Sequence, residues 1–288
     1  MSTAWLVSNR WLVWQRFELQ FEALLQRADE VSLTRCTNDH AAVAVARGDA
    51  LPDVALVMDK DVALIASLEA RGVRCINSAR AIAMCDNKAL THAALTAAGI
   101  AHPDTVVLPY VFDTLSREQW RASEAVAAAK QILGYPLVAK RAVGSWGRGV
   151  HLVADEEELV EMICATQPAP IILERFIARS RGTDARVYMV GDEPVAAMRR
   201  FAAGSDFRAN LTGGGKAQPW DPPAQYVEVA RRAMAALGLE IGAVDFLDSD
   251  EPLVGEVNSN AQFMSLSEVT GVDVASRVIS YLNEVARR

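Results

Sequence analysis

The sequence lacks the cysteine pairs and long apolar runs that mark many secreted, zinc-binding and membrane proteins. Its four cysteines lie far apart and form no CxxC pair, which indicates reduced thiols rather than a disulfide framework or a zinc site. No uncharged apolar run is long enough to form a membrane-spanning helix. Arg10, Arg16 and Glu18 come too early for a signal peptide. We therefore expect a cytoplasmic protein with no membrane partner.

Two familiar phosphate-binding motifs are also missing. No GxxxxGK[ST] segment leads into a helix, so there is no Walker loop. The turn after Ser8 has no glycine trio, which gives a dinucleotide-binding fold of the usual type little support. The formal net charge of −7 argues against a nucleic-acid partner or an anionic membrane surface.

The chain is long and apolar enough for two or three lobes. Its 288 residues, 51% of them hydrophobic, exceed the usual size of one compact domain. Apolar runs predict strands at 4–9, 54–58 and 73–77, and helical spacing predicts helices at 17–27 and 63–70. This alternation of strand and helix favours a parallel sheet in the first ~85 residues.

Beyond residue 85 the pattern changes from alternating strands and helices to strands joined by short turns. Asp86 can cap a helix that ends at Gly99. Gly191-Asp192 predicts the turn of a hairpin between 185 and 201. The other predictions are strands at 135–140, 150–155 and 171–177, helices at 123–133, 155–164, 223–237 and 271–286, and a second hairpin at 241–258.

The second hairpin carries the most informative group of polar residues. A loop from Ser249 to Pro252 would place Leu247 opposite Val254, Asp245 opposite Glu256, and Ala243 opposite Asn258. Side chains alternate along strands, so the two carboxylates and the amide share one face. Such oxygens suit Mg²⁺ together with phosphate oxygens and water. The alternative is a solvated acidic pair at a sheet edge, and spacing alone leaves both open.

A glycine-rich segment, GSWGRG at 144–149, follows a strand that ends at Lys140. Its backbone N–H groups could approach phosphate oxygens closely, with Lys140 beneath them. Lys88 lies in the first turn of its helix, where the helix dipole disfavours a cation unless an anion is near. Taken singly, the bland interpretations are an ordinary turn and an exposed lysine.

Arginines gather around the first hairpin and the loop after it. Adjacent Arg199 and Arg200 must point to opposite faces of a strand, so only one can share a face with Arg186. Guanidinium groups suit phosphates and carboxylates, and surface salt bridging is the alternative for any single one. The histidines show no metal-ligand spacing, and the tryptophans, Trp11 and Trp14 among them, are interpreted as packing residues.

Taken in order, these segments resemble the ATP-grasp superfamily, and specifically its RimK/LysX-type amino-acid ligases. The resemblance runs from about Asn77 to the end of the chain. The segments that carry it are CDNKALTHAALTAAGI, YPLVAKRAVGSWGRGV, IILERFIARSRGTDARVYMVGDEPVAAMRR, DFRANLTGGGKA and GAVDFLDSDEPLVGEVNSN. The resemblance implies an α/β (α+β) ATP-grasp fold. Residues 1–85 would form a preATP-grasp domain and 86–288 the ATP-grasp domain, with a lid at about 103–172 and a C-terminal lobe at about 173–288.

The resemblance also implies roles for individual residues. Lys88 and Lys140 would contact ATP phosphates, and the glycine loop would close over them. Arginines and an asparagine would face the phosphates and the activated carboxylate. The implied residues are Gly144, Ser145, Trp146 and Gly147 in the loop; Glu174, Arg175, Phe176 and Ile177 at the adenine; Asp184 near the ribose; Asp245, Glu256 and Asn258 at Mg²⁺; and Arg186, Arg200 and Arg208 with Asn210 at the reacting groups.

The function that the resemblance implies is ATP-dependent ligation of a carboxylate to an amine through an acyl phosphate. ATP and Mg²⁺ would be the cofactors, with two ions and Mn²⁺ as a substitute. The amine would come from an amino acid, glutamate or an analogue, and the acceptor would be a small molecule, a carrier protein or a peptide C-terminus. A homodimer or homotetramer is expected by analogy. The SNAQF segment at 259–263 departs from RimK itself, so the substrate stays open. Precursor-peptide cross-linking and a non-catalytic nucleotide-binding module are the alternatives.

Overall fold

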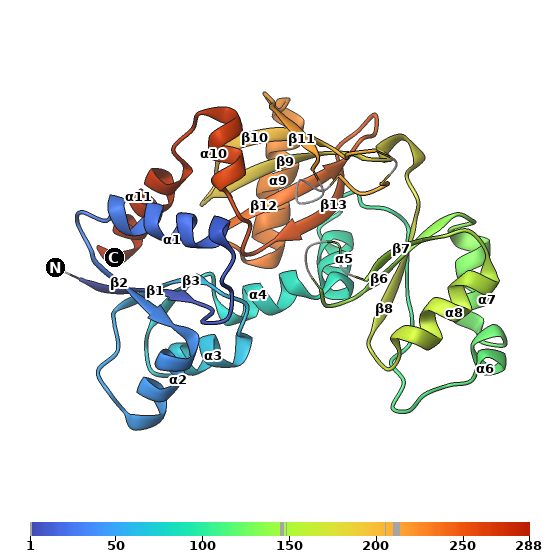
Figure 1. Cartoon of the computed structure of the whole chain (residues 1–288), viewed down its shortest axis with the longest axis horizontal. Helices are drawn as coiled ribbons and strands as arrows, with labels where there is room; N and C mark the ends of the chain where they lie inside the picture. Colours follow the sequence, from blue (N-terminus) through green and yellow to red (C-terminus); the bar gives the residue numbers. More distant parts are fainter. Residues whose placement is uncertain (1, 145–146, 148, 205, 210–213) are drawn as a thin grey trace.

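The computed structural model describes residues 2–144, 147, 149–204, 206–209 and 214–288. It is a mixed α/β structure, and the strands within these residues form three sheets (Figure 1). The strands are β1 Thr3–Ser8, β2 Ser32–Thr37, β3 Val54–Met58, β4 Arg74–Ile76, β5 Thr105–Val107, β6 Leu137–Arg141, β7 Val150–Val153, β8 Ile171–Arg175, β9 Thr183–Val190, β10 Glu193–Phe201, β11 Lys216–Pro219, β12 Ile241–Leu247 and β13 Leu253–Asn258.

The helices cover the sheets and connect them. They are α1 Gln15–Arg27, α2 Asn38–Arg47, α3 Val62–Ala70, α4 Ala79–Asp86, α5 Lys88–Ala97, α6 Arg117–Arg121, α7 Glu124–Ile132, α8 Glu156–Thr166, α9 Ala224–Leu237, α10 Met264–Thr270 and α11 Val274–Ala286, with a 3-10 turn at Ala178–Ser180. None of these helices is long and apolar enough for a membrane crossing.

The first sheet is parallel, as the alternating pattern predicts. Its order is β2-β1-β3-β4, and each neighbouring pair runs parallel. The sequence analysis has no element at β2 or α2. Residues 32–37 alternate in exposure at the sheet edge, so they carry no continuous apolar run.

The second sheet has the order β5-β8-β6-β7 and lies at the far end of the molecule from the termini (Figure 1). Helices α6, α7 and α8 pack beside it around a separate apolar core that includes Trp120 and Leu137. Strand β8 belongs to this sheet and crosses the lobe boundary predicted near residue 173.

The third sheet has the order β11-β10-β9-β12-β13 and carries the two predicted hairpins. The β9–β10 turn falls at Gly191 and Asp192, as predicted. In the second hairpin, Asp245 faces Glu256 and Ala243 faces Asn258, which confirms the inner register.

The outer register of that hairpin is wrong in the sequence analysis. Leu247 pairs with Leu253 rather than Val254, because a β-bulge after Asp245 adds one residue, Gly255, to β13. The turn is therefore one residue longer than predicted, and the bulge restores the predicted pairing at Glu256.

The helix at 88–97 is capped by Asn87, not by Asp86 as predicted. The Asn87 Oδ1 accepts hydrogen bonds from the N–H groups of Ala89 and Leu90. Asp86 instead ends α4, and its carboxylate accepts from Lys60 Nζ at 2.9 Å. Both residues are good N-cap types, and only the extra helix before them decides between the two.

The N-terminal sheet and the third sheet share one apolar core. Leu6 and Phe21 from the first ~30 residues belong to the same buried cluster as Tyr188, Phe263 and Val278. Helix α1 packs against α10 and α11, which bring the chain's last residues back beside its first (Figure 1). This apolar cluster contains residues from both sides of position 85. The lobe boundaries at 85 and 173 stay predictions.

Gly242 holds β12 and β13 close together, because a Cβ there would lie 2.8 Å from the backbone oxygen of Asn258. We expect Gly242→Ala to lower the free energy of unfolding by about 1–3 kcal/mol, because overpacking forces the strands apart. Urea unfolding measures the change. Gly255→Ala is the matched control in the same hairpin: its Cβ would meet only the Leu247 side chain, so its loss should be smaller. Equal losses would contradict this account of Gly242.

Candidate functional site

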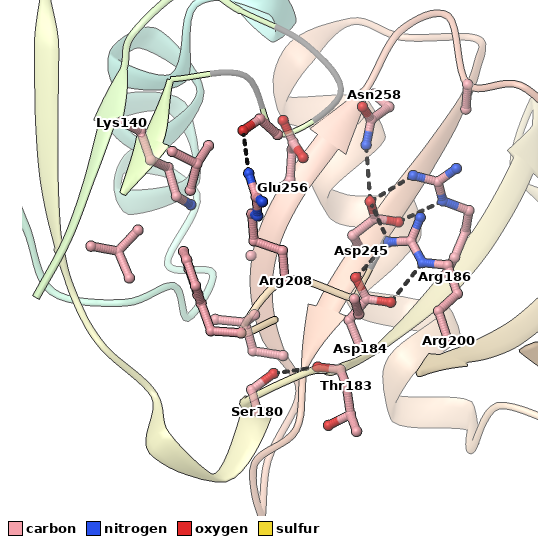
Figure 2. Close-up of a pocket in the computed structure, with 18 of the residues that line it drawn as sticks. Lys140, Ser180, Thr183, Asp184, Arg186, Arg200, Arg208, Asp245, Glu256 and Asn258 are labelled. Atoms are coloured by element: carbon pink, nitrogen blue, oxygen red, sulfur yellow. Dashed lines mark hydrogen bonds and ion pairs between the residues drawn. The ribbon is translucent and has the colours of Figure 1, made fainter. Parts of the chain in front are cut away.

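A cavity of about 360 Å³ lies between the second and third sheets and reaches the start of α1. Residues from all three parts of the chain line it: Lys140 and Glu174 from the second sheet, Asp245 and Glu256 from the third, and Trp14 before α1. Figure 2 shows Lys140 on its strand facing the third sheet across this space. The cavity thus brings together predicted residues that lie more than 100 positions apart.

One ion cluster of four charged residues lies on the floor of the cavity (Figure 2). Asp245 is buried, and Asp184, Arg186 and Arg200 are partly buried. Asp245 accepts two hydrogen bonds from Arg186, each 2.7 Å long. Asp184 accepts two from Arg200, at 2.6 and 2.5 Å. Arg200 also lies 3.0 Å from Asp245, which joins the two pairs. As predicted, Arg200 shares a face with Arg186, while Arg199 turns away to stack over Trp220.

Burial and pairing have opposite effects on the two aspartates. Burial alone would raise the pKa of Asp245, but Arg186 and Arg200 outweigh it and lower that pKa. For Asp184, burial dominates and raises the pKa despite Arg200. Removing one member of such a cluster leaves an uncompensated buried charge, which costs about 3–5 kcal/mol. The cluster therefore fixes the cavity floor.

The three predicted metal ligands converge on this floor. Asn258 Nδ2 donates to Asp245 Oδ2 at 3.1 Å, and Glu256 lines the same cavity. Across the described part of the chain, no three His, Cys, Asp or Glu side chains gather as a metal cluster. A cation here would therefore take Glu256, Asn258 and phosphate oxygens. It would also need Asp245 to share an oxygen now bonded to arginine.

The two predicted phosphate lysines each have a carboxylate partner. Lys88 begins α5, as predicted, and its Nζ lies 3.3 Å from Glu256 Oε1 and donates to the Gly144 carbonyl at 2.9 Å. Lys140 Nζ lies 2.6 Å from Glu174 Oε2. Burial would raise the pKa of Glu174, but Lys140 and His92 outweigh it and lower that pKa to about 2.

The glycine loop is tied to the third sheet's loop by an arginine. Arg208 donates to the Gly147 carbonyl at 2.9 Å (Figure 2). It also pairs with Asp206. The predicted residues Ser145, Trp146 and Asn210 lie outside the described residues. Gly144 and Gly147 line the cavity.

The end of the cavity near β8 has apolar walls that suit a flat aromatic base. Phe176 packs edge-on against Phe207, with centroids 6.3 Å apart, and Ile177 and Val138 continue the wall. Arg175 lies here too, but its guanidinium binds the carbonyls of the α7 end and Asp104.

Several residues that line the cavity were not predicted from the sequence. Trp14 lines it, although it was interpreted as a packing residue. Arg16 lines it as well and donates to Ser265 Oγ at 2.7 Å. The Thr183 Oγ1 and Asn260 Oδ1 atoms are buried in the wall without a hydrogen-bond partner among the described residues. No motif marks them, because only folding brings 14–16 and 260–265 together.

Trp11 is a second correction, since its side chain is 70% exposed rather than packed. Val13, in the same segment between β1 and α1, is 75% exposed. The segment therefore presents apolar surface next to the cavity wall at Trp14.

Comparison with known proteins identifies the fold and the family. The model of the RimK-like ATP-grasp domain matches residues 85–282. The chain belongs to this family. One relative is a probable alpha-L-glutamate ligase of Cellvibrio japonicus. It is 30% identical to this chain over 283 residues, which cover 92% of this chain and 90% of that protein.

Solved structures of ATP-grasp proteins share the fold. The D-alanine–D-alanine ligase of Bacillus anthracis matches with a TM-score of 0.74 at 17% identity, covering 100% of this chain and 98% of that one. A RimK domain protein of Sphaerobacter thermophilus matches with a TM-score of 0.66 at 23% identity, covering 98% and 99%. These structural matches show that the chain has the ATP-grasp fold.

Some relatives are longer than the matched stretch. The chain spans about half the length of the probable alpha-L-glutamate ligases of Rhodopirellula baltica and Picosynechococcus, 53% and 52% respectively.

The low pKa of Glu174 predicts an acid-sensitive contribution to stability. Its pKa falls from 4.5 to about 2 on folding, so the stabilisation is present above pH 4.5 and is lost as the pH falls toward 2. We expect the stability difference between wild type and Glu174→Gln to shrink by about 2 kcal/mol from pH 5 to pH 3. Urea unfolding at both pH values measures it. Glu251→Gln is the control at an exposed glutamate, and its stability difference from wild type should be the same at both pH values. An unchanged difference between wild type and Glu174→Gln would contradict the prediction.

Proposed function

We propose that this protein is an ATP- and Mg²⁺-dependent ligase that joins a carboxylate to the amine of an amino acid, glutamate or a close analogue. The observation that carries the proposal is that one cavity gathers the residues proposed to act. Its lining includes Lys88, Lys140, Arg186, Arg200, Arg208, Asp245, Glu256 and Asn258. Positioning and charge neutralisation by such groups are what phosphoryl transfer requires of a protein.

Related proteins support this choice of substrates. The relatives are named probable alpha-L-glutamate ligases. Neighbouring structures include the Bacillus anthracis ligase with ATP, and the ATP-grasp ligase PsnB with a minimal precursor, Mg and ADP. ATP and Mg²⁺ are therefore proposed as cofactors, with two metal ions and replacement by Mn²⁺ as the finer expectation.

The proposed reaction has two steps and uses no protein nucleophile. A carboxylate oxygen attacks the γ-phosphorus of ATP, and the bond to the β-phosphate oxygen breaks, which releases ADP and forms an acyl phosphate. The amine nitrogen then attacks the acyl carbon, loses a proton, and expels phosphate as the amide forms. Bringing the groups together supplies most of the acceleration.

The chain's own residues would hold the reactants. Lys88 and Lys140 would bind phosphate oxygens, and Arg208 would hold the glycine loop over them. Arg186 and Arg200 would face the carboxylate that reacts. Phe176 and Ile177 would enclose the adenine, with Asp184 near the ribose. Mg²⁺ held by Asp245, Glu256 and Asn258 would supply charge neutralisation at the phosphates.

A second candidate is ligation on a peptide or protein acceptor, including precursor-peptide cross-linking. The cavity continues from the ion cluster to Trp14 and Arg16, and exposed Trp11 and Val13 lie beside that end. This surface exceeds what a single amino acid needs. The oligomeric state and a cytoplasmic location remain expectations.

Glu256→Gln tests the metal assignment. Removing this carboxylate should weaken Mg²⁺ binding and lower the rate of ATP-dependent phosphate release at least about 100-fold. The assay screens amino acids with carboxylate acceptors, and mass spectrometry identifies the product. Glu251→Gln, in the loop of the same hairpin, should retain the wild-type rate. Full activity of Glu256→Gln would refute the role of Glu256.

Trp14→Ala tests whether the far end of the cavity binds the acceptor. Loss of an indole contact should raise the KM of the acceptor found by that screen about tenfold and leave the KM of ATP unchanged. Trp11→Ala is the control for a small acceptor, because Trp11 lies outside the cavity lining. If Trp11→Ala raises the same KM as strongly, the acceptor extends over the exposed segment, which favours the peptide candidate. An unchanged KM in Trp14→Ala would place the acceptor elsewhere.

A further inference from the structure

Behind Lys140, a buried histidine contacts the carboxylate that pairs with this lysine. Nε2 of His92, on α5, lies 3.2 Å from Glu174 Oε1, while Lys140 Nζ lies 2.6 Å from Oε2 of the same group. His92 is 6% exposed and Glu174 is 2% exposed. Three elements, α5, β8 and β6, thus meet through one shared carboxylate.

A carboxylate this deeply buried needs partners on both oxygens. An ionised carboxylate away from water is costly unless it is paired and hydrogen-bonded. Its lowered pKa keeps Glu174 ionised at neutral pH. Lys140 satisfies Oε2, whereas Oε1 is buried with no hydrogen-bond partner of good geometry among the described residues. His92 Nε2, 3.2 Å away, is the polar group that approaches Oε1. Without His92, we expect the Glu174 carboxylate to rotate toward water, or to place both oxygens against Lys140. Either rotation would displace the Lys140 ammonium.

The His92 ring is held in the orientation that this contact requires. A carboxylate only accepts hydrogen bonds, so Nε2 must carry the proton. The other ring nitrogen, Nδ1, lies 2.9 Å from Thr105 Oγ1 and 3.0 Å from His102 Nδ1. His102 is fixed in turn by Thr96 Oγ1 at 2.8 Å and by the Pro103 carbonyl at 2.9 Å.

These outer contacts have the form of an orienting shell. Groups that bind the second nitrogen of a histidine set which nitrogen carries the proton and how the ring turns. Burial, and then the neighbouring His92, lower the pKa of His102, which keeps its ring neutral as a partner at neutral pH. One connected path of contacts therefore runs through five side chains, in the order Thr96, His102, His92, Glu174 and Lys140.

We propose that His92 is a positioning residue for nucleotide binding, which acts through Glu174 to fix the Lys140 ammonium where it meets the phosphates. The inference rests on the proposed function, because it assumes that Lys140 contacts phosphate. Lys140 has three N–H donors and gives one to Glu174. Two donors then remain for phosphate oxygens, and their direction follows from the position of Glu174.

Calorimetric titration of the full-length protein with ADP and Mg²⁺, and separately with adenosine, tests this role. His92→Leu should weaken ADP binding about tenfold and leave adenosine binding within about twofold, because only the phosphates meet Lys140. His92→Gln, which keeps an N–H donor at similar reach, should restore ADP binding to within about twofold of wild type. Equal loss of adenosine and ADP binding would show a distorted pocket and overturn the proposal.

Three further variants make the result decisive. Thr105→Val removes the hydroxyl beside Nδ1 at nearly constant volume and should weaken ADP binding about threefold, even if His92→Leu does not fold. His151→Leu, an exposed histidine on β7 of the same sheet, should leave ADP binding unchanged. Wild-type ADP affinity in both His92→Leu and Thr105→Val, with weakened binding in Lys140→Ala, would overturn the positioning role alone. No ADP binding by the wild type would instead overturn the proposed function.

Discussion

The buried ion cluster of Asp184, Arg186, Arg200 and Asp245 ties together the middle strands of the third sheet. It contains two positive and two negative groups, and each arginine makes paired contacts with one carboxylate. Such pairs are expensive to break singly, because the remaining charge stays buried. The relative positions of β9, β10 and β12 at the cavity floor follow from this constraint. Glu256 and Asn258 then depend on it through the β12–β13 register.

Local patterns in the sequence were enough to predict much of this floor. Strand alternation allowed only one of Arg199 and Arg200 to share a face with Arg186, and the resemblance implied Arg200. Counting back from the hairpin turn paired Asp245 with Glu256. The turn itself was wrong by one residue. A bulge at Gly255 compensates for this error. An isolated glycine within a strand is a local signal of a bulge, and the sequence analysis did not use it.

Contacts between distant segments were beyond prediction. Trp14 looked like a packing residue, and His92 had no motif, because their importance comes from which segments lie opposite them in the fold. The short edge strand β2 and helix α2 were missed for a related reason: residues 32–37 have mixed exposure.

Each basic residue proposed to act in the cavity has an acidic partner. The pairs are Lys88 with Glu256, Lys140 with Glu174, Arg186 with Asp245, Arg200 with Asp184, and Arg208 with Asp206. Within these five pairs the charges cancel, so none of these five cations is left without an acidic partner. Polyphosphate would have to compete with a carboxylate for each of them.

That balance gives a physical reason for a divalent cation in the proposed reaction. Positive charge brought in with the nucleotide would offset both the phosphates and Glu256, which now faces Lys88. Lys88 could then turn to phosphate without leaving a carboxylate unpaired. Glu174 has no such replacement, because it lies buried behind Lys140. The second oxygen of Glu174 therefore needs a partner from the protein itself. His92 Nε2, 3.2 Å from that oxygen, is in the position to provide one.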